Sequence, residues 1–241
     1  MRTLIISDIH ANLTALEAVL LDVGEYDQVW CLGDLVGYGP EPNECISRLV
    51  DLKDLTCVLG NHDAAALGMI DINAFNHDAR LSLQWLENKL TSFSRRFLEG
   101  LEERFSQNNV TMVHGSPFNP VWEYIFDIPM ATKNFKSFES QVCLVGHTHV
   151  PCLFSQDVSG QVIRHFLAPN QPFTLQEKSI LNPGSVGQPR DRDPRASYMI
   201  YDTEAATWEL RRVAYDIAYV QARIFQERLP VTHAYRLKEG I

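Results

Sequence analysis

The sequence predicts an α/β fold in which two packed β-sheets are flanked by helices. Short β-branched and apolar runs alternate with segments of helical periodicity over roughly the first 150 residues, and further short apolar runs separated by turn residues follow. The chain has 241 residues, 45% of them hydrophobic, which is enough to bury a full core. Because no linker, repeat or low-complexity tract interrupts it, we expect a single domain over residues 1–241.

The first part of the chain repeats a strand, a loop and a helix. Residues 3–7 form an apolar run too short for a helix, and residues 13–21 then show helical spacing after Asn12, a candidate N-cap. The same plan continues with a strand, a helix and a third strand at residues 28–32, 42–50 and 55–59. Strands that alternate with helices predict a parallel sheet at the core.

The remaining elements are predicted from the same periodicities. Two helices are expected over residues 73–89 and 92–101, and two strands over residues 110–113 and 142–145. After Val150 we expect an antiparallel meander and a closing helix, with ranges 152–154, 162–166, 197–201, 208–213 and 216–228.

Composition and charge narrow the function. The formal net charge of -9 argues against a nucleic-acid coat or an anionic membrane surface as the partner, since both need excess Lys and Arg. The N-terminal apolar run is too short for a signal peptide, and no later stretch approaches a membrane span. The five cysteines are odd in number and lack C-x-x-C spacing, as is typical of buried thiols in a reducing compartment. We therefore expect a cytoplasmic protein whose anionic substrate is held by local positive charge.

Polar side chains gather where the predicted strands end. Any one of these motifs is compatible with a simple turn, but five such endings are not. The carboxyl ends of parallel strands share one edge of a sheet, so we expect the clusters to converge there. The five clusters are Ser7-Asp8-Ile9-His10, Gly33-Asp34, Gly60-Asn61-His62-Asp63, His114-Gly115 and Gly146-His147-Thr148-His149.

These clusters contain seven candidate metal ligands: Asp8, His10, Asp34, Asn61, His114, His147 and His149. Oxygen and imidazole donors without a thiolate suit Zn²⁺, Mn²⁺ or Fe. Seven ligands are too many for one catalytic ion, whereas two divalent transition-metal ions that share Asp34 would use them all. Two such ions against two carboxylates leave an excess of about two positive charges, enough to hold a phosphate. Paired ions of this kind generate a hydroxide and clamp an in-line displacement.

The ordered set D-x-H, G-D, G-N-H-D, H-G and G-H-x-H resembles the calcineurin-like metallophosphoesterase superfamily, and the stretch 182–190 resembles its small prokaryotic branch. The resemblance implies a four-layer α/β sandwich of two mixed sheets. It also implies hydrolysis of a small phosphorylated substrate, as a phosphatase or phosphodiesterase, by attack of a metal-bridging hydroxide. The implied ligands are Asp8, His10, Asp34 and His149 for one metal, and Asp34, Asn61, His114 and His147 for the other.

The resemblance also implies two catalytic residues: His62 would protonate or stabilise the leaving oxygen, and Asp63 would orient the His62 imidazole. One departure concerns the arginines that serine/threonine phosphatases and diadenosine tetraphosphatases carry after the G-D motif and before G-N-H. Here those positions read Leu35 to Pro40 and Leu59. Arg190 is the candidate replacement for binding the substrate phosphate, and Trp122 and Tyr124 are candidates for a pocket wall.

Two other functions remain open at this stage. A nuclease of the same superfamily would be expected to carry a basic surface, which the acidic balance opposes. A non-catalytic interaction module that retains the fold would usually lose metal ligands or the leaving-group histidine. Here the seven candidate ligands and His62 are all present. Of the remaining histidines, His77 is interpreted as a surface or capping residue, and His165 and His233 receive no role.

Overall fold

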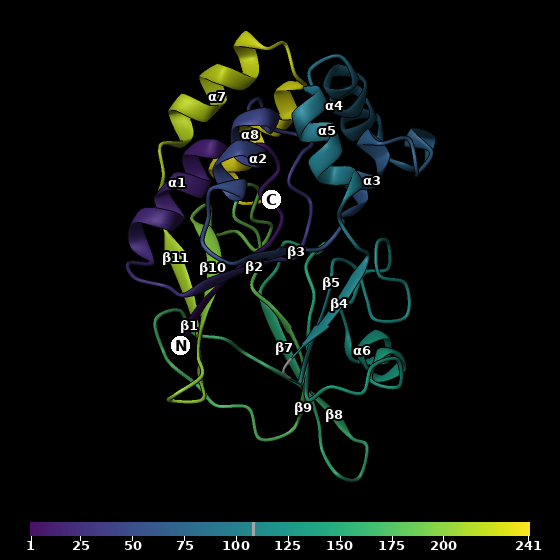
Figure 1. The fold of residues 1–241 in the computed structure, drawn as a ribbon, viewed down its shortest axis with the longest axis vertical. Coiled ribbons are helices and arrows are strands. Elements are labelled where there is room, and N and C mark those ends of the chain that lie inside the picture. Colours follow the sequence, from purple (N-terminus) through teal and green to yellow (C-terminus); the bar gives the residue numbers. More distant parts are fainter. Residues whose placement is uncertain (108) are drawn as a thin grey trace.

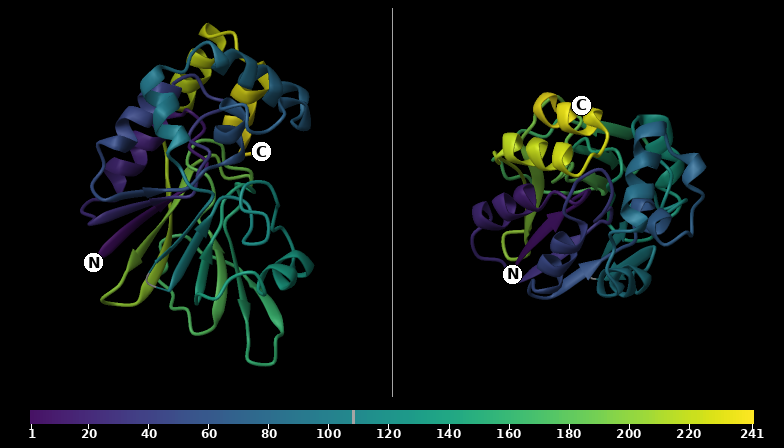
Figure 2. Two further views of the ribbon diagram at one scale, coloured as in Figure 1. Left: turned by 45° about the vertical axis from the view of Figure 1, so that its right-hand side comes forward. Right: turned by 90° about the horizontal axis from the view of Figure 1, so that it is seen from above.

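Two β-sheets pack face to face, with helices on their outer faces, in the computed structural model of residues 1–107 and 109–241 (Figure 1). Most helices gather at one end of the molecule. Figure 2 shows the strands fanning apart toward the opposite end. The α/β fold with two mixed sheets is thus confirmed.

The first sheet has the strand order β11-β10-β1-β2-β3. Its strands are β1 (Arg2–Ile6), β2 (Gln28–Cys31), β3 (Leu55–Cys57), β10 (Ala196–Asp202) and β11 (Thr207–Val213). β1, β2 and β3 run parallel, as predicted, whereas β10 and β11 add to the β1 edge in antiparallel register.

The second sheet has the order β4-β5-β6-β9-β7-β8. Its strands are β4 (Arg104–Gln107), β5 (Val110–Val113), β6 (Val142–Leu144), β7 (Cys152–Gln156), β8 (Val162–His165) and β9 (Lys178–Asn182). β5, β6 and β9 are parallel, and β4, β7 and β8 pair with their neighbours in antiparallel fashion.

Helices cover both sheets. They are α1 (Leu13–Asp22), α2 (Pro42–Val50), α3 (Asn61–Ala66), α4 (His77–Glu87), α5 (Ser92–Glu99), α6 (Ile128–Asn134), α7 (Ile217–Gln226) and α8 (Val231–Glu239), with a short 3₁₀ turn η1 (Ile72–Ala74) before α4. α1 packs on β10 and β11, while α6 packs on β7 and β8. Asn12 caps α1 as expected, its side chain accepting from the Ala15 amide at 3.0 Å. No helix in the described part of the chain is long and apolar enough to cross a membrane.

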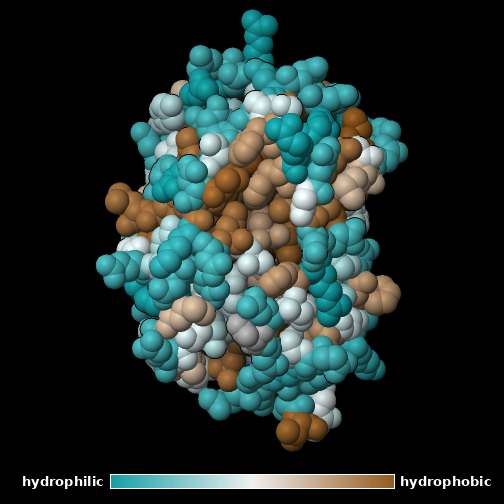
Figure 3. All heavy atoms as spheres, in the orientation of Figure 1, coloured by the Kyte–Doolittle hydropathy of each residue, from teal (hydrophilic) through white to brown (hydrophobic). Residues whose placement is uncertain are grey.

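Strand β1 shows why the central strands are apolar throughout. Leu4 and Ile6 belong to the core beneath the helices, whereas Ile5, between them, belongs to the core between the two sheets. Successive side chains of a strand point to opposite faces, so a strand covered on both faces reads as a continuous apolar run. On the face shown in Figure 3, hydrophobic side chains gather in a hollow over the region between α2 and α5, and the lower half is mostly hydrophilic.

The strands that follow Val150 do not form one antiparallel meander, as was predicted, but are divided between the two sheets. β7 and β8 lie in the second sheet, whereas β10 and β11 extend the first. The strand β9 was not predicted; it follows β8 in sequence and lies between β6 and β7 in the second sheet. The short helix α3 was not predicted, and the predicted helix over residues 73–89 is divided into η1 and α4. α8 was not predicted either.

Candidate metal centre

The five polar clusters meet where strands of both sheets end. β1, β2 and β3 supply the clusters around Asp8, Asp34 and Asn61, and β5 and β6 of the second sheet supply those that begin at His114 and Gly146. The clusters are joined directly, since the backbone amide of His147 donates to both carboxylate oxygens of Asp8 at 3.2 Å. The predicted convergence is therefore real, but it occurs between two sheets rather than along one sheet edge.

The backbone at this junction is strained. Five of the seven candidate ligands have a positive φ although none is glycine: Asp8 (54°), His10 (49°), Asp34 (54°), His147 (65°) and His149 (59°). Non-glycine residues rarely adopt this left-handed conformation, and it concentrates at functional sites where the surrounding structure enforces it. Gly60 is required here by close approach, because a Cβ at that position would lie 2.1 Å from Oδ1 of Asp34.

The candidate ligands form two groups that share Asp34. Within each group, one donor atom per residue lies within 4.8 Å of all the others: Asp8, His10, Asp34 and His149 in the first, and Asp34, His114 and His147 in the second. Oδ1 of Asn61 lies 3.0 Å from Nε2 of His114 and so belongs beside the second group. The structure thus brings together all seven predicted ligands, and every one is buried.

Each of the four imidazoles is held by a backbone carbonyl. The contacts are His10 Nδ1 with Val36 O (3.1 Å), His114 Nδ1 with Leu32 O (2.8 Å), His147 Nε2 with Trp122 O (3.1 Å) and His149 Nδ1 with Gln188 O (2.6 Å). A carbonyl only accepts, so this nitrogen carries the proton, and the other nitrogen of a neutral ring is left with a lone pair. Metal-binding histidines in proteins are oriented in the same way.

The remaining imidazole nitrogens face one another in pairs. Nε2 of His10 lies 3.1 Å from Nε2 of His149, and Nε2 of His114 lies 3.1 Å from Nδ1 of His147. When the rings are neutral and the other nitrogen donates to a carbonyl, these nitrogens carry lone pairs directed at the same space, and a cation between them would relieve their repulsion. Ligands bound to one Zn²⁺ at about 2.0–2.1 Å are spaced by about 3 Å, so the residues fit a metal at each pair.

Asp34 connects the two pairs. Its Oδ1 accepts from the His62 backbone amide at 2.8 Å, whereas its Oδ2 is buried without a hydrogen-bond partner. Oδ2 lies 3.5 Å from Nε2 of His10 and 3.3 Å from Nε2 of His114. An orphaned carboxylate oxygen between two sets of nitrogen donors fits a bridging ligand.

Burial dominates the electrostatics of the centre. Desolvation lowers the pKa of His10, His147 and His149 well below its usual range, which favours the neutral rings that bind metals. Burial also raises the pKa of Asp8 to about 7. For His114, burial lowers the pKa, but the neighbouring Asp34 carboxylate outweighs it and raises the pKa to about 9. Desolvation therefore dominates at Asp8, whereas the charge of Asp34 dominates at His114.

His62 is placed beside the centre without joining either group. Its ring lies 4.9 Å from the ring of His10 and 4.4 Å from that of Tyr38. Its Nδ1 is buried without a hydrogen-bond partner and faces Gly37, where a Cβ would come within 2.4 Å of it. Nε2, at the other end of the ring, therefore points away from Gly37.

The expectation that Asp63 orients the His62 imidazole is wrong. Oδ1 of Asp63 accepts from the amides of Leu35 (2.9 Å) and Val36 (3.2 Å), and its Oδ2 accepts from the amide of Gly60 (3.1 Å). Because α3 begins at Asn61, Asp63 lies in the first helical turn with its carboxylate directed back at the G-D loop. Asp63 thus braces the backbone next to Asp34 rather than the side chain of His62.

The three predicted substrate-binding residues lie around the centre. Nη2 of Arg190 donates to Oε1 of Gln188 at 2.8 Å and contacts the Tyr38 hydroxyl at 3.4 Å, so its guanidinium lies at the metal edge. The ring of Tyr124 stacks on His147 with centroids 3.7 Å apart and is 38% exposed. Trp122 contributes its carbonyl to His147 and keeps its ring half-buried.

Sequence reasoning missed Tyr38, Phe75 and His233 as neighbours of the site. The ring of Tyr38 lies 4.6 Å from that of His10, and the ring of Phe75 lies 5.0 Å from that of His62. His233 reaches the site from α8, with its ring 4.8 Å from Tyr38 and its Nε2 2.7 Å from the Ser82 hydroxyl. Tyr38 could have been found, because it follows the G-D motif between two glycines.

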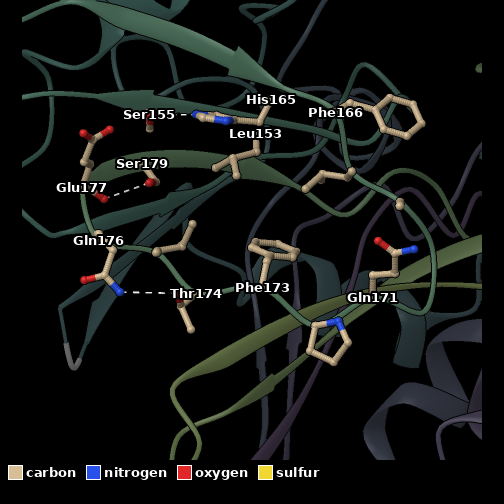
Figure 4. A pocket seen from close by; sticks show the side chains of 14 residues that line it. Leu153, Ser155, His165, Phe166, Gln171, Phe173, Thr174, Gln176, Glu177 and Ser179 are labelled. Atoms are coloured by element: carbon tan, nitrogen blue, oxygen red, sulfur yellow. Dashed lines mark hydrogen bonds between the residues drawn. The ribbon is translucent and has the colours of Figure 1, made fainter.

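A separate cavity of 510 Å³ lies away from the metals, under the segment that follows β8 (Figure 4). Its polar groups already have partners: Ser155 Oγ lies 2.8 Å from Nε2 of His165, and Ser179 Oγ donates to the Glu177 carbonyl at 2.8 Å. Of its apolar side chains, Leu153 belongs to the core between the two sheets and Phe173 packs against that core (Figure 4). The hydrogen bond with Ser155 therefore explains the position of the His165 side chain without a role in the metal centre.

Comparison with known proteins agrees with this geometry. Residues 1–206 match the family model described as "Calcineurin-like phosphoesterase superfamily domain". An uncharacterized protein of Methanocaldococcus jannaschii is 37% identical over 245 residues, covering 98% of this chain and 97% of that protein. The crystal structure of a metallophosphoesterase from Sphaerobacter thermophilus is 44% identical, with a TM-score of 0.92, and the match covers 100% of this chain and 99% of that one.

A more limited likeness extends to proteins with a named substrate. A symmetrical bis(5'-nucleosyl)-tetraphosphatase of Pseudomonas syringae is 33% identical over 125 residues, which cover 48% of this chain and 42% of that enzyme. The longer matches and the buried groups of Asp and His side chains both indicate a metal-dependent phosphoesterase. The chain belongs to the calcineurin-like phosphoesterase superfamily and is a metal-dependent phosphoric ester hydrolase.

Proposed function

We propose that this protein is a binuclear phosphoesterase, a phosphatase or phosphodiesterase that hydrolyses a small phosphorylated substrate. The observation that carries the proposal is Oδ2 of Asp34, which is buried, has no hydrogen-bond partner and lies between the two imidazole pairs. Asp8, His10, Asp34 and His149 would hold one divalent ion, and Asp34, Asn61, His114 and His147 the other. Such ions polarise phosphoryl oxygens and lower the pKa of a bound water. Mn, Zn and Fe all suit this donor set.

His62 would serve the leaving oxygen. Its Nδ1 faces Gly37 in a buried contact, so Nε2 is the nitrogen available to a substrate. The His62 side chain is not needed as a metal ligand, because the orphaned oxygen and the paired nitrogens belong to other residues. A proton held at Nε2, or a hydrogen bond from it, would stabilise the charge that develops as the ester bond breaks.

Arg190 would bind the phosphate. Its guanidinium lies 5.7 Å from the Tyr38 ring centroid, and its Nε is buried without a partner. A guanidinium donates several hydrogen bonds in a fixed plane and can pair bidentately with phosphate oxygens. Its positive charge sits in a protein of net charge -9, so anion capture would depend on Arg190 together with the metals.

Metal-dependent hydrolysis is the first test. Metal-stripped protein should be inactive on 4-nitrophenyl phosphate and bis(4-nitrophenyl) phosphate, and Mn²⁺ or Zn²⁺ should restore activity on at least one. Asp34→Asn should lower the restored rate by at least about 10²-fold, more than the loss of a supporting contact would. Asp51→Asn, at an exposed carboxylate after α2, is the control. Activity that survives chelation, or Asp34→Asn activity equal to the control, would contradict the proposal.

The role of His62 is tested by the leaving group. His62→Ala should keep the metals but reduce turnover of an alkyl phosphate by about 10²–10⁴-fold, the usual loss for a general acid. The loss should be smaller for 4-nitrophenyl phosphate, because nitrophenolate needs little protonation. Steady-state rates on the two esters, with metal analysis of each preparation, measure this. Equal losses on both would rule out proton donation and leave electrostatic stabilisation as the only role.

Gly37 tests the orientation of that imidazole. Gly37→Ala should displace the His62 ring, because the new Cβ would lie 2.4 Å from Nδ1, and should reproduce the leaving-group dependence of His62→Ala. Gly160→Ala is a matched control: its φ of +87° is close to the +89° of Gly37, but no atom lies within 4 Å of its Cβ. Both variants carry similar backbone strain, so only a loss specific to Gly37→Ala supports the contact. Similar kinetics in the two variants would refute it.

Substrate capture by Arg190 is tested by charge-preserving substitution. Arg190→Lys should already raise KM for monoesters, and Arg190→Ala should raise it further, because an ammonium cannot reproduce the planar pairing. The effect should be smaller for diesters, whose phosphoryl group carries less negative charge. Arg96→Lys, at an exposed position in α5, is the control, and the metal content should not change. Monoester kinetics indifferent to both Arg190 variants would leave phosphate binding to the metals alone.

A further inference from the structure

The imidazole of His62 is bordered by a chain of aromatic rings. The Phe75 ring lies 5.0 Å from it at an interplanar angle of 72°, and the Trp122 ring lies 5.0 Å from Phe75 at 86°. Both are the edge-to-face arrangements that aromatic pairs prefer. Phe75 and Trp122 are half-buried, so each retains some accessible surface. We call this pair the aromatic wall.

The aromatic wall is tied to the catalytic geometry through its backbone. The carbonyl of Trp122 is the hydrogen-bond acceptor of His147, and the amide of Phe75 donates to the Ile72 carbonyl at 3.1 Å in the turn that precedes α4. The two residues come from different parts of the fold, the segment between η1 and α4 and the segment between β5 and α6. The Phe75 and Trp122 rings are thus brought together by the hydrogen bonds that hold the two segments, although the residues are far apart in sequence.

The two sides of the site differ in chemistry. On the Arg190 side, the guanidinium and the two candidate metal positions provide positive charge. On the His62 side, the imidazole contacts the rings of Tyr38, His10 and Phe75, and among the described residues no Lys or Arg side chain is hydrogen-bonded or ion-paired to His62. Arg190 and the candidate metal ligands therefore mark the cationic part of the site, and Phe75, beside His62, adds an uncharged aromatic ring.

We propose that the aromatic wall selects esters whose leaving group carries a planar aromatic or heterocyclic ring. This inference rests on the phosphoesterase function proposed above and on His62 facing the leaving oxygen. A group that serves a leaving oxygen must come within about 2.6–3.2 Å of it. A ring joined to that oxygen by one carbon can then come within the 4.5–7 Å range of an aromatic contact with Phe75, which lies 5.0 Å from His62 and next to Trp122.

A matched pair of substrates isolates the ring. Benzyl phosphate and cyclohexylmethyl phosphate have the same connectivity and similar primary alkoxide leaving groups, but only the first has a planar π-system. The metal-loaded enzyme should have a kcat/KM about 3–10-fold higher for the benzyl ester, the range expected of an aromatic pair. Both esters are assayed as free monoesters and as methyl diesters, so that either class of phosphoesterase reports on the ring.

Variants assign the preference to the aromatic wall. Phe75→Leu and Trp122→Leu should each lower the benzyl to cyclohexylmethyl ratio toward one, because the π-face is lost, whereas Phe75→Tyr should preserve it. Any general disturbance of His62 would lower both rates equally and leave the ratio unchanged. Phe93→Leu, at an exposed phenylalanine of α5, is the control for an aromatic substitution elsewhere.

The outcomes separate this inference from the function on which it rests. A wild-type ratio near one, or a ratio unchanged in both leucine variants, overturns the aromatic wall while leaving the phosphoesterase intact. If the metal-loaded protein hydrolyses the 4-nitrophenyl esters but neither of these two esters, the aromatic wall is overturned and the phosphoesterase function stands. If none of the esters is hydrolysed while the metals are bound, the phosphoesterase function itself fails and the inference fails with it.

Discussion

A buried carboxylate oxygen with no hydrogen-bond partner, Oδ2 of Asp34, is the constraint on which the site depends. Removing a carboxylate from water costs several kcal/mol unless opposite charge compensates it. Nε2 of His10 and Nε2 of His114 lie 3.5 Å and 3.3 Å from this oxygen, and the other nitrogen of each ring contacts a backbone carbonyl. The folded chain bears the free-energy cost of the desolvated carboxylate and of the left-handed backbone at five candidate ligands. Cations bound at the two imidazole pairs would relieve the electrostatic part of this cost.

The two-sheet architecture is what makes this constraint possible. The first sheet contributes both carboxylates, and the second contributes His114, His147 and His149, so neither sheet could complete a site alone. The amide of His147 binds Asp8 across the junction, which couples the position of one sheet to the other. The same junction offers a way for an acidic chain to hold phosphate, because metal ions bound there, together with Arg190, would supply positive charge locally.

Much of the site was readable from the sequence, and the misses have physical causes. The seven ligands follow apolar strands, and strand ends that converge are implied by parallel pairing. Asp63 was misassigned because a three-residue spacing in a short helix directs its carboxylate back to the Gly60 amide, a local hydrogen bond that the G-N-H-D motif does not reveal. Phe75 and His233 reach the site through tertiary packing of η1 and α8. β9 was missed because only two apolar residues, Ile180 and Leu181, lie between its polar ends.

Anomalous diffraction from crystals grown with Mn²⁺ or Zn²⁺ tests the central claim most directly. The account predicts two peaks, one beside His10 and His149 and the other beside His114 and His147, with Oδ2 of Asp34 ligating both ions. Crystals of Asp34→Asn prepared in the same way should lose occupancy at one or both positions. A single peak at full metal loading, or two peaks with Asp34 contacting only one of them, would contradict the bridged centre.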